Sequence, residues 1–102
     1  NAYRGKYEGS PFSRDSAYHQ GTVWPWLLGL YVDAIFKYEN ESAREEAQMI
    51  VRNIAAHLDH ACIGSISEIF DGDYPHLPRG AISQAWSVAE LLRVSQKYNL
   101  FA

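Results

Sequence analysis

Residues 24–38 read WPWLLGLYVDAIFKY, and this stretch decides how the chain folds. Its apolar side chains recur at three- and four-residue spacing, which predicts a helix. They occupy one face and continue onto the opposite one: Leu27, Leu30, Tyr31, Ala34, Ile35 and Tyr38, then Leu28, Val32 and Phe36. A helix that is apolar on nearly all sides is buried on nearly all sides. We therefore expect an inner helix over residues 22–39, with Pro25 near its start.

Two more helices are expected after this one. Residues 42–60 carry a single apolar stripe, which predicts an outer helix with one face in water, and Ser42 with Glu45 forms a capping-box pattern at its start. Residues 82–98 are apolar on more than one face and predict a second inner helix. Residues 1–21 and 64–80 lack periodicity and are expected to be loops.

The order of these helices predicts where the loops lie. Helices joined by short links run antiparallel, so helices 22–39 and 82–98 should begin at the same end of the fold. The loops that precede them, residues 10–26 and 64–80, are therefore expected to meet on one surface. The sequence thus predicts an all-α fold of three helices with two loops gathered at one end.

Composition bounds the class of protein. The chain has 102 residues, which is enough for one small domain. Trp, Tyr and Phe make up 14% of it, which is more aromatic surface than a domain of this size readily buries. Some rings should therefore face a ligand or protein outside the chain. The start at Asn1, without an initiator Met, favours a piece of a longer protein.

Charge and cysteine content exclude several classes. The net charge is −3 and the basic residues are scattered, which argues against a nucleic-acid or anionic-membrane surface. No run approaches the ~18 apolar residues of a membrane span. The single Cys62 allows neither an internal disulfide nor a cysteine-rich zinc site, so a cytoplasmic location is expected.

The two expected loops carry the side chains that sugar sites use. Planar polar groups bind hydroxyls, and aromatic faces cover the apolar C–H patches of a sugar ring. The loops supply carboxylates, amide and imidazole donors, an Arg and indole rings.

Three motifs stand in order along the chain: HQGTVWPW (residues 19–26), EIFDGD (68–73) followed by PRG (78–80), and QAWSVAELL (84–92). Together they resemble the C-terminal signatures of amylo-α-1,6-glucosidases, the glucosidase half of glycogen debranching enzymes. The resemblance runs from about Tyr3 to Arg93. It implies that the chain is a three-helix C-terminal fragment of an (α/α)6 barrel.

The resemblance also implies a reaction. The parent would be an inverting hydrolase of α-1,6 branch stubs on glycogen-like glucans, with Glu68 as the general base and His19, Gln20, Trp24, Asp71 and Arg79 around the sugar. An inverting base deprotonates a water molecule and lies roughly 6.5–9.5 Å from the general acid. That acid, an Asp, would lie upstream, so the fragment alone is expected to be inactive.

No cofactor is expected. The implied partners are the glucan and the upstream barrel domain, and the isolated fragment could self-associate through its exposed inner faces.

Alternatives stay open from the residues alone. Asp71-Gly72-Asp73 is either a turn or, with His19 or His76, part of a metal site, but its calcium-loop pattern is incomplete and no metal is expected. Arg79 could pair with Glu68 or Asp71, or cap the loop. Trp86 is interpreted as core. The competing functions are another helical-barrel glucosidase, such as a trehalase-like one, and a non-catalytic carbohydrate-binding module.

Overall fold

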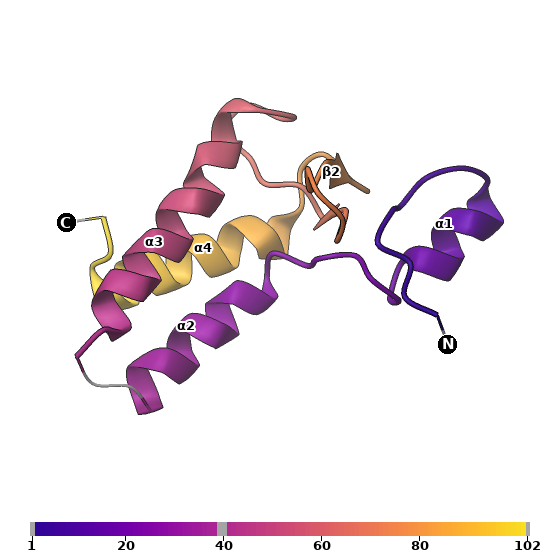
Figure 1. Ribbon diagram of the computed structural model, residues 1–102. Helices are drawn as coiled ribbons and strands as arrows, with labels where there is room; N and C mark the ends of the chain where they lie inside the picture. Colours follow the sequence, from indigo (N-terminus) through magenta and orange to yellow (C-terminus); the bar gives the residue numbers. More distant parts are fainter. Residues whose placement is uncertain (1, 39–40, 102) are drawn as a thin grey trace.

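The computed structural model describes residues 2–38 and 41–101, which are mostly helical (Figure 1). The elements are α1 (Pro11–Ala17), α2 (Leu27–Tyr38), α3 (Ala43–Ala55), the 3-10 helix η1 (Ala56–Asp59), β1 (Ile69–Phe70), β2 (Pro78–Arg79) and α4 (Ala85–Tyr98). The three expected helices are present as α2, α3 and α4, so the mainly helical class is confirmed. The last residue of the first expected helix, residue 39, lies outside the described residues.

Two segments expected to be loops contain short elements. Pro11–Ala17 forms α1, where Ser10 Oγ accepts a hydrogen bond from the Ser13 N–H and Pro occupies the first position. A helix of two turns is too short to produce a readable periodicity. In residues 64–80, β1 and β2 pair antiparallel, with Ile69 opposite Arg79.

The α2 helix begins at Leu27 and not at residue 22 as expected, and α4 begins at Ala85 and not at residue 82, whereas α3 begins one residue after its expected start. Trp24 to Trp26 form turns before α2, with the Leu27 and Leu28 amides donating to the carbonyls of Trp24 and Pro25. Ser42 is the N-cap residue of α3, as the capping-box pattern predicts, but its side chain does not make the capping bond. The α4 helix begins at Ala85 and ends at Asn99, whose left-handed backbone is a common helix terminus.

The core lies where α2, α3 and α4 pack together (Figure 1). The helices contribute buried aliphatic residues, and two further ones come from the chain before β1 and after α4: Val32, Ile35, Ala47, Val51, Leu91 and Val94, then Ile66 and Leu100. Burying each large aliphatic side chain contributes about 1.5–3 kcal/mol. Ile66 is fully buried and therefore anchors the segment that leads to Glu68.

The prediction that α2 and α4 are buried on nearly all sides is wrong for this chain. Leu30 of α2 and Leu92 of α4 are 52% and 60% exposed. Trp86, interpreted from the sequence as core, is 47% exposed. The physical reason is that three packed helices cover only one side of each other, so the second apolar face of each inner helix has no cover within the described residues.

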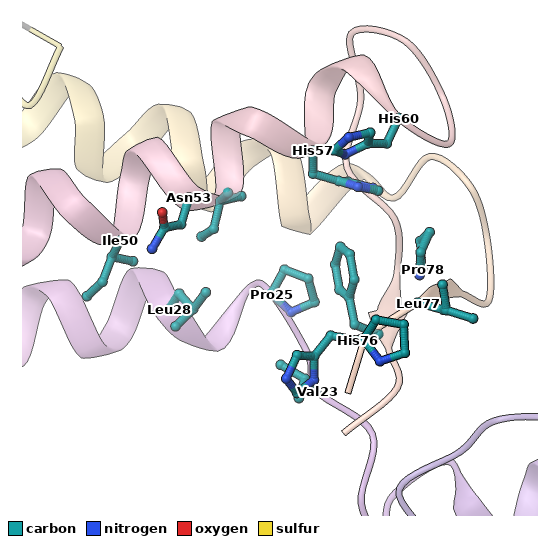
Figure 2. Close-up of a pocket in the computed structure, with 13 residues that line it drawn as sticks. Val23, Pro25, Leu28, Ile50, Asn53, His57, His60, His76, Leu77 and Pro78 are labelled. Atoms are coloured by element: carbon teal, nitrogen blue, oxygen red, sulfur yellow. The ribbon is translucent and has the colours of Figure 1, made fainter. Parts of the chain in front are cut away.

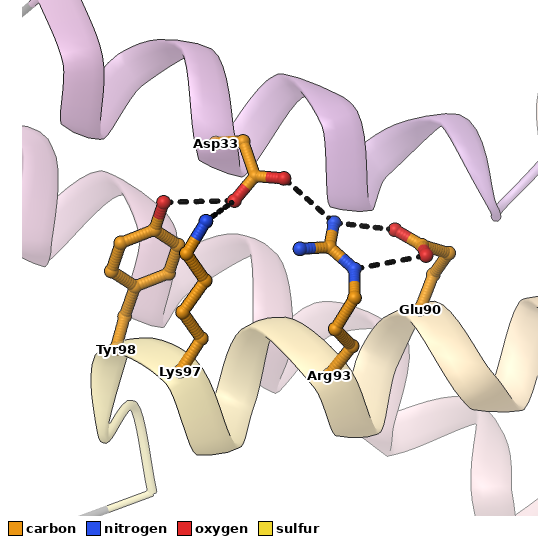
Figure 3. Close-up of polar contacts among 5 residues, drawn as sticks. All are labelled: Asp33, Glu90, Arg93, Lys97 and Tyr98. Carbon is orange, nitrogen blue, oxygen red and sulfur yellow. Dashed lines mark hydrogen bonds and ion pairs between the residues drawn. The ribbon is translucent and has the colours of Figure 1, made fainter.

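A polar cluster links α2 to α4 along the edge of the core (Figure 3). Asp33 of α2 forms ion pairs with Arg93 at 2.8 Å and Lys97 at 2.9 Å, and it accepts a hydrogen bond from Tyr98 Oη. Arg93 also forms two bonds with Glu90. The hydrogen bond from Arg93 is the main cause that holds the pKa of Asp33 well below its usual range.

Replacing Asp33 by Asn tests this cluster. The folded pKa of Asp33 lies below its ordinary value of 3.8, so its stabilisation is fully present above that pH and is lost as the pH falls through the folded pKa. We expect D33N to lower the free energy of unfolding by about 1–3 kcal/mol at pH 7 and by progressively less below the ordinary value. Urea unfolding over a pH series measures this. D15N on exposed α1 is the control, and an equal loss at all pH values would contradict the assignment.

Candidate functional site

The loops before α2 and α4 meet at one end of the fold, as predicted. Val23 and Phe70 form an isolated antiparallel bridge in which each amide donates to the other carbonyl at 2.9 Å. The N-terminal stretch joins them, since the Arg4 amide donates to the Gln20 carbonyl and the Gly72 amide donates to the Gly5 carbonyl. Three segments far apart in the sequence therefore build this end of the molecule.

The two motif glycines at this junction allow the backbones to touch. A Cβ on Gly72 would lie 2.0 Å from the Gly21 carbonyl oxygen, which is closer than any side chain tolerates. This close approach explains the glycine of DGD. The glycine of HQG is required by the N-terminal stretch, since a Cβ on Gly21 would lie 2.4 Å from the Arg4 carbonyl oxygen.

A buried carboxylate fastens the junction. Asp71 is 2% exposed. Its Oδ1 accepts from the Tyr7 amide at 2.8 Å, and its Oδ2 accepts from Arg79 Nε at 3.0 Å and lies 2.9 Å from Arg79 Nη2. The hydrogen bond to Asp71 is the main cause that raises the pKa of Arg79. Of the partners left open for Arg79, Asp71 is the one observed; a looser ion pair with Glu8 spans 3.5 Å.

Glu68 lies directly before β1 and is half-buried. Its Oε1 accepts a hydrogen bond from Tyr18 Oη, and its Oε2 accepts one from the Ala81 amide at 2.9 Å. The Glu68 amide in turn donates to the Ala81 carbonyl at 2.9 Å. Each carboxylate oxygen therefore has one fixed donor, and each keeps capacity for a further bond.

Gly80 is needed beside this carboxylate. Its φ is +68°, a conformation that favours glycine, and a Cβ there would lie 2.4 Å from Glu68 Oε2. The glycine of the PRG motif thus leaves the space that Glu68 occupies.

Glu68 opens onto a polar cavity of about 610 Å³. The cavity is formed by the N-terminal stretch, α1 and the chain around β2, and is lined by Tyr7, Glu8, Gly9, Arg14, Glu68, Pro78, Arg79, Gly80 and Ala81. A carboxylate held by two donors at the wall of such a cavity can accept a proton from a bound water or hydroxyl. The guanidinium groups of Arg14 and Arg79, which also line the cavity, can bind polar ligand atoms.

The structure brings together only some of the predicted site residues. Glu68 and Arg79 line the cavity, and Asp71 lies behind Arg79 without reaching the surface. Gln20 instead borders a separate hollow of about 240 Å³, with Ala2, Arg4 and Ser16.

His19 and Trp24 form an aromatic stack beside the cavity, not in its wall. Their rings lie parallel, with centroids 5.2 Å apart. The Trp24 indole donates to the Tyr18 carbonyl at 3.2 Å. Both rings also pack against the Tyr18 ring, with centroids 4.7 Å from it, and so hold Tyr18 in place. The ring centroids of Trp24 and Trp86 lie 6.2 Å apart.

Sequence reasoning did not single out Tyr18, Tyr7, Glu8 or Arg14. Tyr18 directly precedes the HQG motif, and this adjacency is the only signal that could have drawn attention to it. The other three come from the N-terminal stretch and α1, which carry no periodic pattern or recognisable motif.

A larger cavity lies elsewhere, between α2, α3 and the 70–78 segment (Figure 2). Its volume is about 790 Å³, and its lining is mainly apolar, with Val23, Pro25, Leu28 and Phe70 among the residues. No carboxylate among the described residues lines it. Acid–base chemistry therefore assigns the candidate site to the smaller polar cavity.

Of the histidines that line the apolar cavity, His57 and His76 have hydrogen-bond partners, His76 through its Nδ1, which lies 3.0 Å from the Asp71 carbonyl oxygen. His57 is buried, and its Nε2 lies 3.1 Å from Ser67 Oγ and accepts from the Ser67 amide at 3.4 Å. Burial is the main cause that lowers the pKa of His57, which favours the neutral ring as acceptor. His57 thus braces the residue next to Glu68.

Within residues 2–38 and 41–101, no three His, Cys, Asp or Glu side chains gather in a way that could hold a metal ion. In the same residues, no helix has the length and apolar character needed to span a membrane.

The fold and the cavity define a mainly helical domain that carries a carboxylate and guanidinium site at its loop end. Comparison with protein families gives a match to amylo-alpha-1,6-glucosidase over residues 1–93. The chain therefore belongs to the amylo-alpha-1,6-glucosidase family and is a domain related to glycogen debranching enzymes. Neither the curated proteins nor the solved structures gave a match.

Replacing Arg79 by Ala tests the Asp71 clamp. The change leaves a carboxylate that is nearly fully buried without its charged partner, so we expect the free energy of unfolding to fall by about 3–5 kcal/mol. Urea denaturation measures the loss. R52A, on the exposed side of α3, is the matched control. A loss below about 1 kcal/mol in R79A would place this pair among ordinary surface ion pairs.

Proposed function

We propose that the chain is one part of an (α/α)6-barrel glycoside hydrolase that removes α-1,6-linked branch stubs from glycogen-like glucans, with Glu68 as its general base. Membership of the family supports the substrate class. The observation that carries the catalytic assignment is the Glu68 carboxylate, held by Tyr18 and Ala81 at the wall of a polar cavity.

The proposed reaction needs Glu68 as a carboxylate. It removes a proton from a water molecule that attacks the anomeric carbon, while a general acid on the other face protonates the leaving oxygen. The acid, an Asp upstream in the complete enzyme, would lie roughly 6.5–9.5 Å from Glu68. Both carboxyl groups are required, so the chain alone would be inactive.

Roles for the other predicted residues follow from their positions. Arg79 lies on the cavity and would bind sugar hydroxyls with the guanidinium surface that Asp71 does not occupy. Asp71, buried and bonded at both oxygens, would position Arg79 instead of touching sugar. His19, Trp24 and Gln20 lie outside the cavity wall within this chain, and they would reach sugar only at a subsite completed by the rest of the enzyme.

The barrel supplies the missing cover for the helices. Leu27 and Leu30 of α2, with Trp86 and Leu92 of α4, are each between 46% and 60% exposed. Contiguous exposed apolar surface is typical of an interface. In the proposed enzyme, upstream helices of the same barrel would cover them, and in the isolated chain they would promote self-association. A cytoplasmic location and the absence of a cofactor remain part of the proposal.

Replacing Glu68 by Gln in the complete enzyme tests the function. Gln keeps the shape of the side chain but cannot accept the proton, so we expect kcat for release of glucose from α-1,6-branched limit dextrin to fall by about 10²–10⁴-fold. E45Q, on the exposed face of α3, is the control and should retain the parent rate. NMR of the first product should give the β-anomer, as inversion requires.

The same assay separates the competing functions. An E68Q rate within a few-fold of the parent would support a non-catalytic carbohydrate-binding role. Cleavage of trehalose without cleavage of isomaltose-type linkages would move the chain to a trehalase-like substrate.

A further inference from the structure

Tyr18 is the one side chain that the structure bonds to Glu68 within the described residues. Its hydroxyl donates to Glu68 Oε1, across 50 positions of sequence. Tyr18 itself does not line the cavity on which Glu68 opens. It therefore reaches the carboxylate from the protein side.

The position of Tyr18 is fixed from several directions. Its amide donates to the Arg14 carbonyl at 3.0 Å, at the end of α1. Its carbonyl accepts from Thr22 Oγ1 and from the Trp24 indole. Its ring packs edge-on against Trp24 at 4.7 Å and at a tilt against Tyr7 at 5.6 Å. A ring held in this way loses little further freedom when its hydroxyl bonds to a carboxylate.

We propose that Tyr18 is a positioning residue for Glu68: its hydroxyl on Oε1 and the Ala81 amide on Oε2 set the carboxylate at one angle, with its free acceptor capacity toward the cavity. This inference rests on the proposed function of Glu68. Orientation matters because a general base must meet its water at about 2.6–3.2 Å, and a carboxylate free to rotate meets it in only a fraction of its conformers.

The protonation of Tyr18 supports this role. The hydrogen bond to Glu68 is the main cause that raises the pKa of Tyr18 to about 12. The phenol thus keeps its proton through the neutral range. Tyr18 acts in this bond as a donor and does not compete with Glu68 for the proton of water.

Replacing Tyr18 by Phe in the complete enzyme tests the proposal kinetically. The variant keeps the ring packing and removes only the donor, so we expect kcat to fall about 10- to 100-fold, the worth of a hydrogen bond to a charged group. KM should stay within about threefold, since Tyr18 does not line the substrate cavity.

The matched control is Y3F. Tyr3 Oη also donates to a carboxylate, Asp73 Oδ1, at 3.0 Å in the same loop region, but neither residue lines the cavity. This variant loses the same kind of bond and should keep the parent kcat. If Y3F and Y18F lost kcat equally, the loss would come from general loosening of the loops, which would contradict the proposal.

A spectroscopic readout tests the pairing without changing Tyr18. In enzyme that carries tyrosine labelled at ¹³Cζ at position 18 alone, the phenol should stay protonated at about pH 10.5. In E68Q the carboxylate is gone, so the pKa of Tyr18 should fall toward its ordinary value of 10.0, with burial still raising it. An unchanged Tyr18 titration in E68Q would overturn the pairing, and this holds even if Y18F fails to fold.

The kinetic outcomes distinguish a failure of this inference from a failure of the proposed role of Glu68 as general base. If E68Q abolishes hydrolysis while Y18F keeps kcat within twofold, Tyr18 is not a positioning residue and Glu68 remains the base. If Y18F raises KM alone, Tyr18 contacts substrate and the proposal is wrong. If E68Q retains hydrolysis, the proposed function itself fails.

Discussion

The buried carboxylate of Asp71 is the constraint on which the loop end depends. Removing a charge from water is unfavourable unless the charge is paired and hydrogen-bonded. Asp71 has such partners from two separate segments, the Tyr7 amide and the Arg79 side chain. Its own amide donates to the Leu77 carbonyl, which closes the loop between β1 and β2. The clamp fixes the N-terminal stretch against β2, and the cavity that contains Glu68 lies between them.

The helices provide the platform for this end. Ile66 and Ile69, on either side of Glu68, are fully buried, so packing against the core sets the path of the backbone there. The α2 and α4 helices approach so closely that a Cβ on Gly29 would lie 3.0 Å from Glu90 Cβ. Arg93 bonds to this Glu90 side chain and also pairs with Asp33 of α2 (Figure 3). The helical core, the contact between α2 and α4, and the Asp71–Arg79 pair thus together fix the position of the Glu68 carboxylate.

The spacing of apolar residues along the sequence could predict one part of this fold. The α2, α3 and α4 helices and the meeting of their loops follow from apolar spacing and short links. The α1 helix was missed because two turns carry no pattern, and the exposure of Trp86 was missed because spacing marks an apolar face without showing what covers it. The choice of Asp71 over Glu68 as the partner of Arg79 depends on register across β1 and β2. The Tyr18 bond to Glu68 joins positions 18 and 68, a contact that no local pattern contains.

In the proposed enzyme, Glu68 faces the reacting water in a sugar-binding cavity completed by the rest of the barrel. A crystal structure of the complete enzyme with a glucose-shaped iminosugar would test this placement. We expect the ring in the cavity bordered by Arg79 and Gly80, with an ordered water about 2.6–3.2 Å from a Glu68 oxygen. An iminosugar bound in the apolar cavity of Val23 and Phe70, with Glu68 remote from it, would rule out Glu68 as the general base.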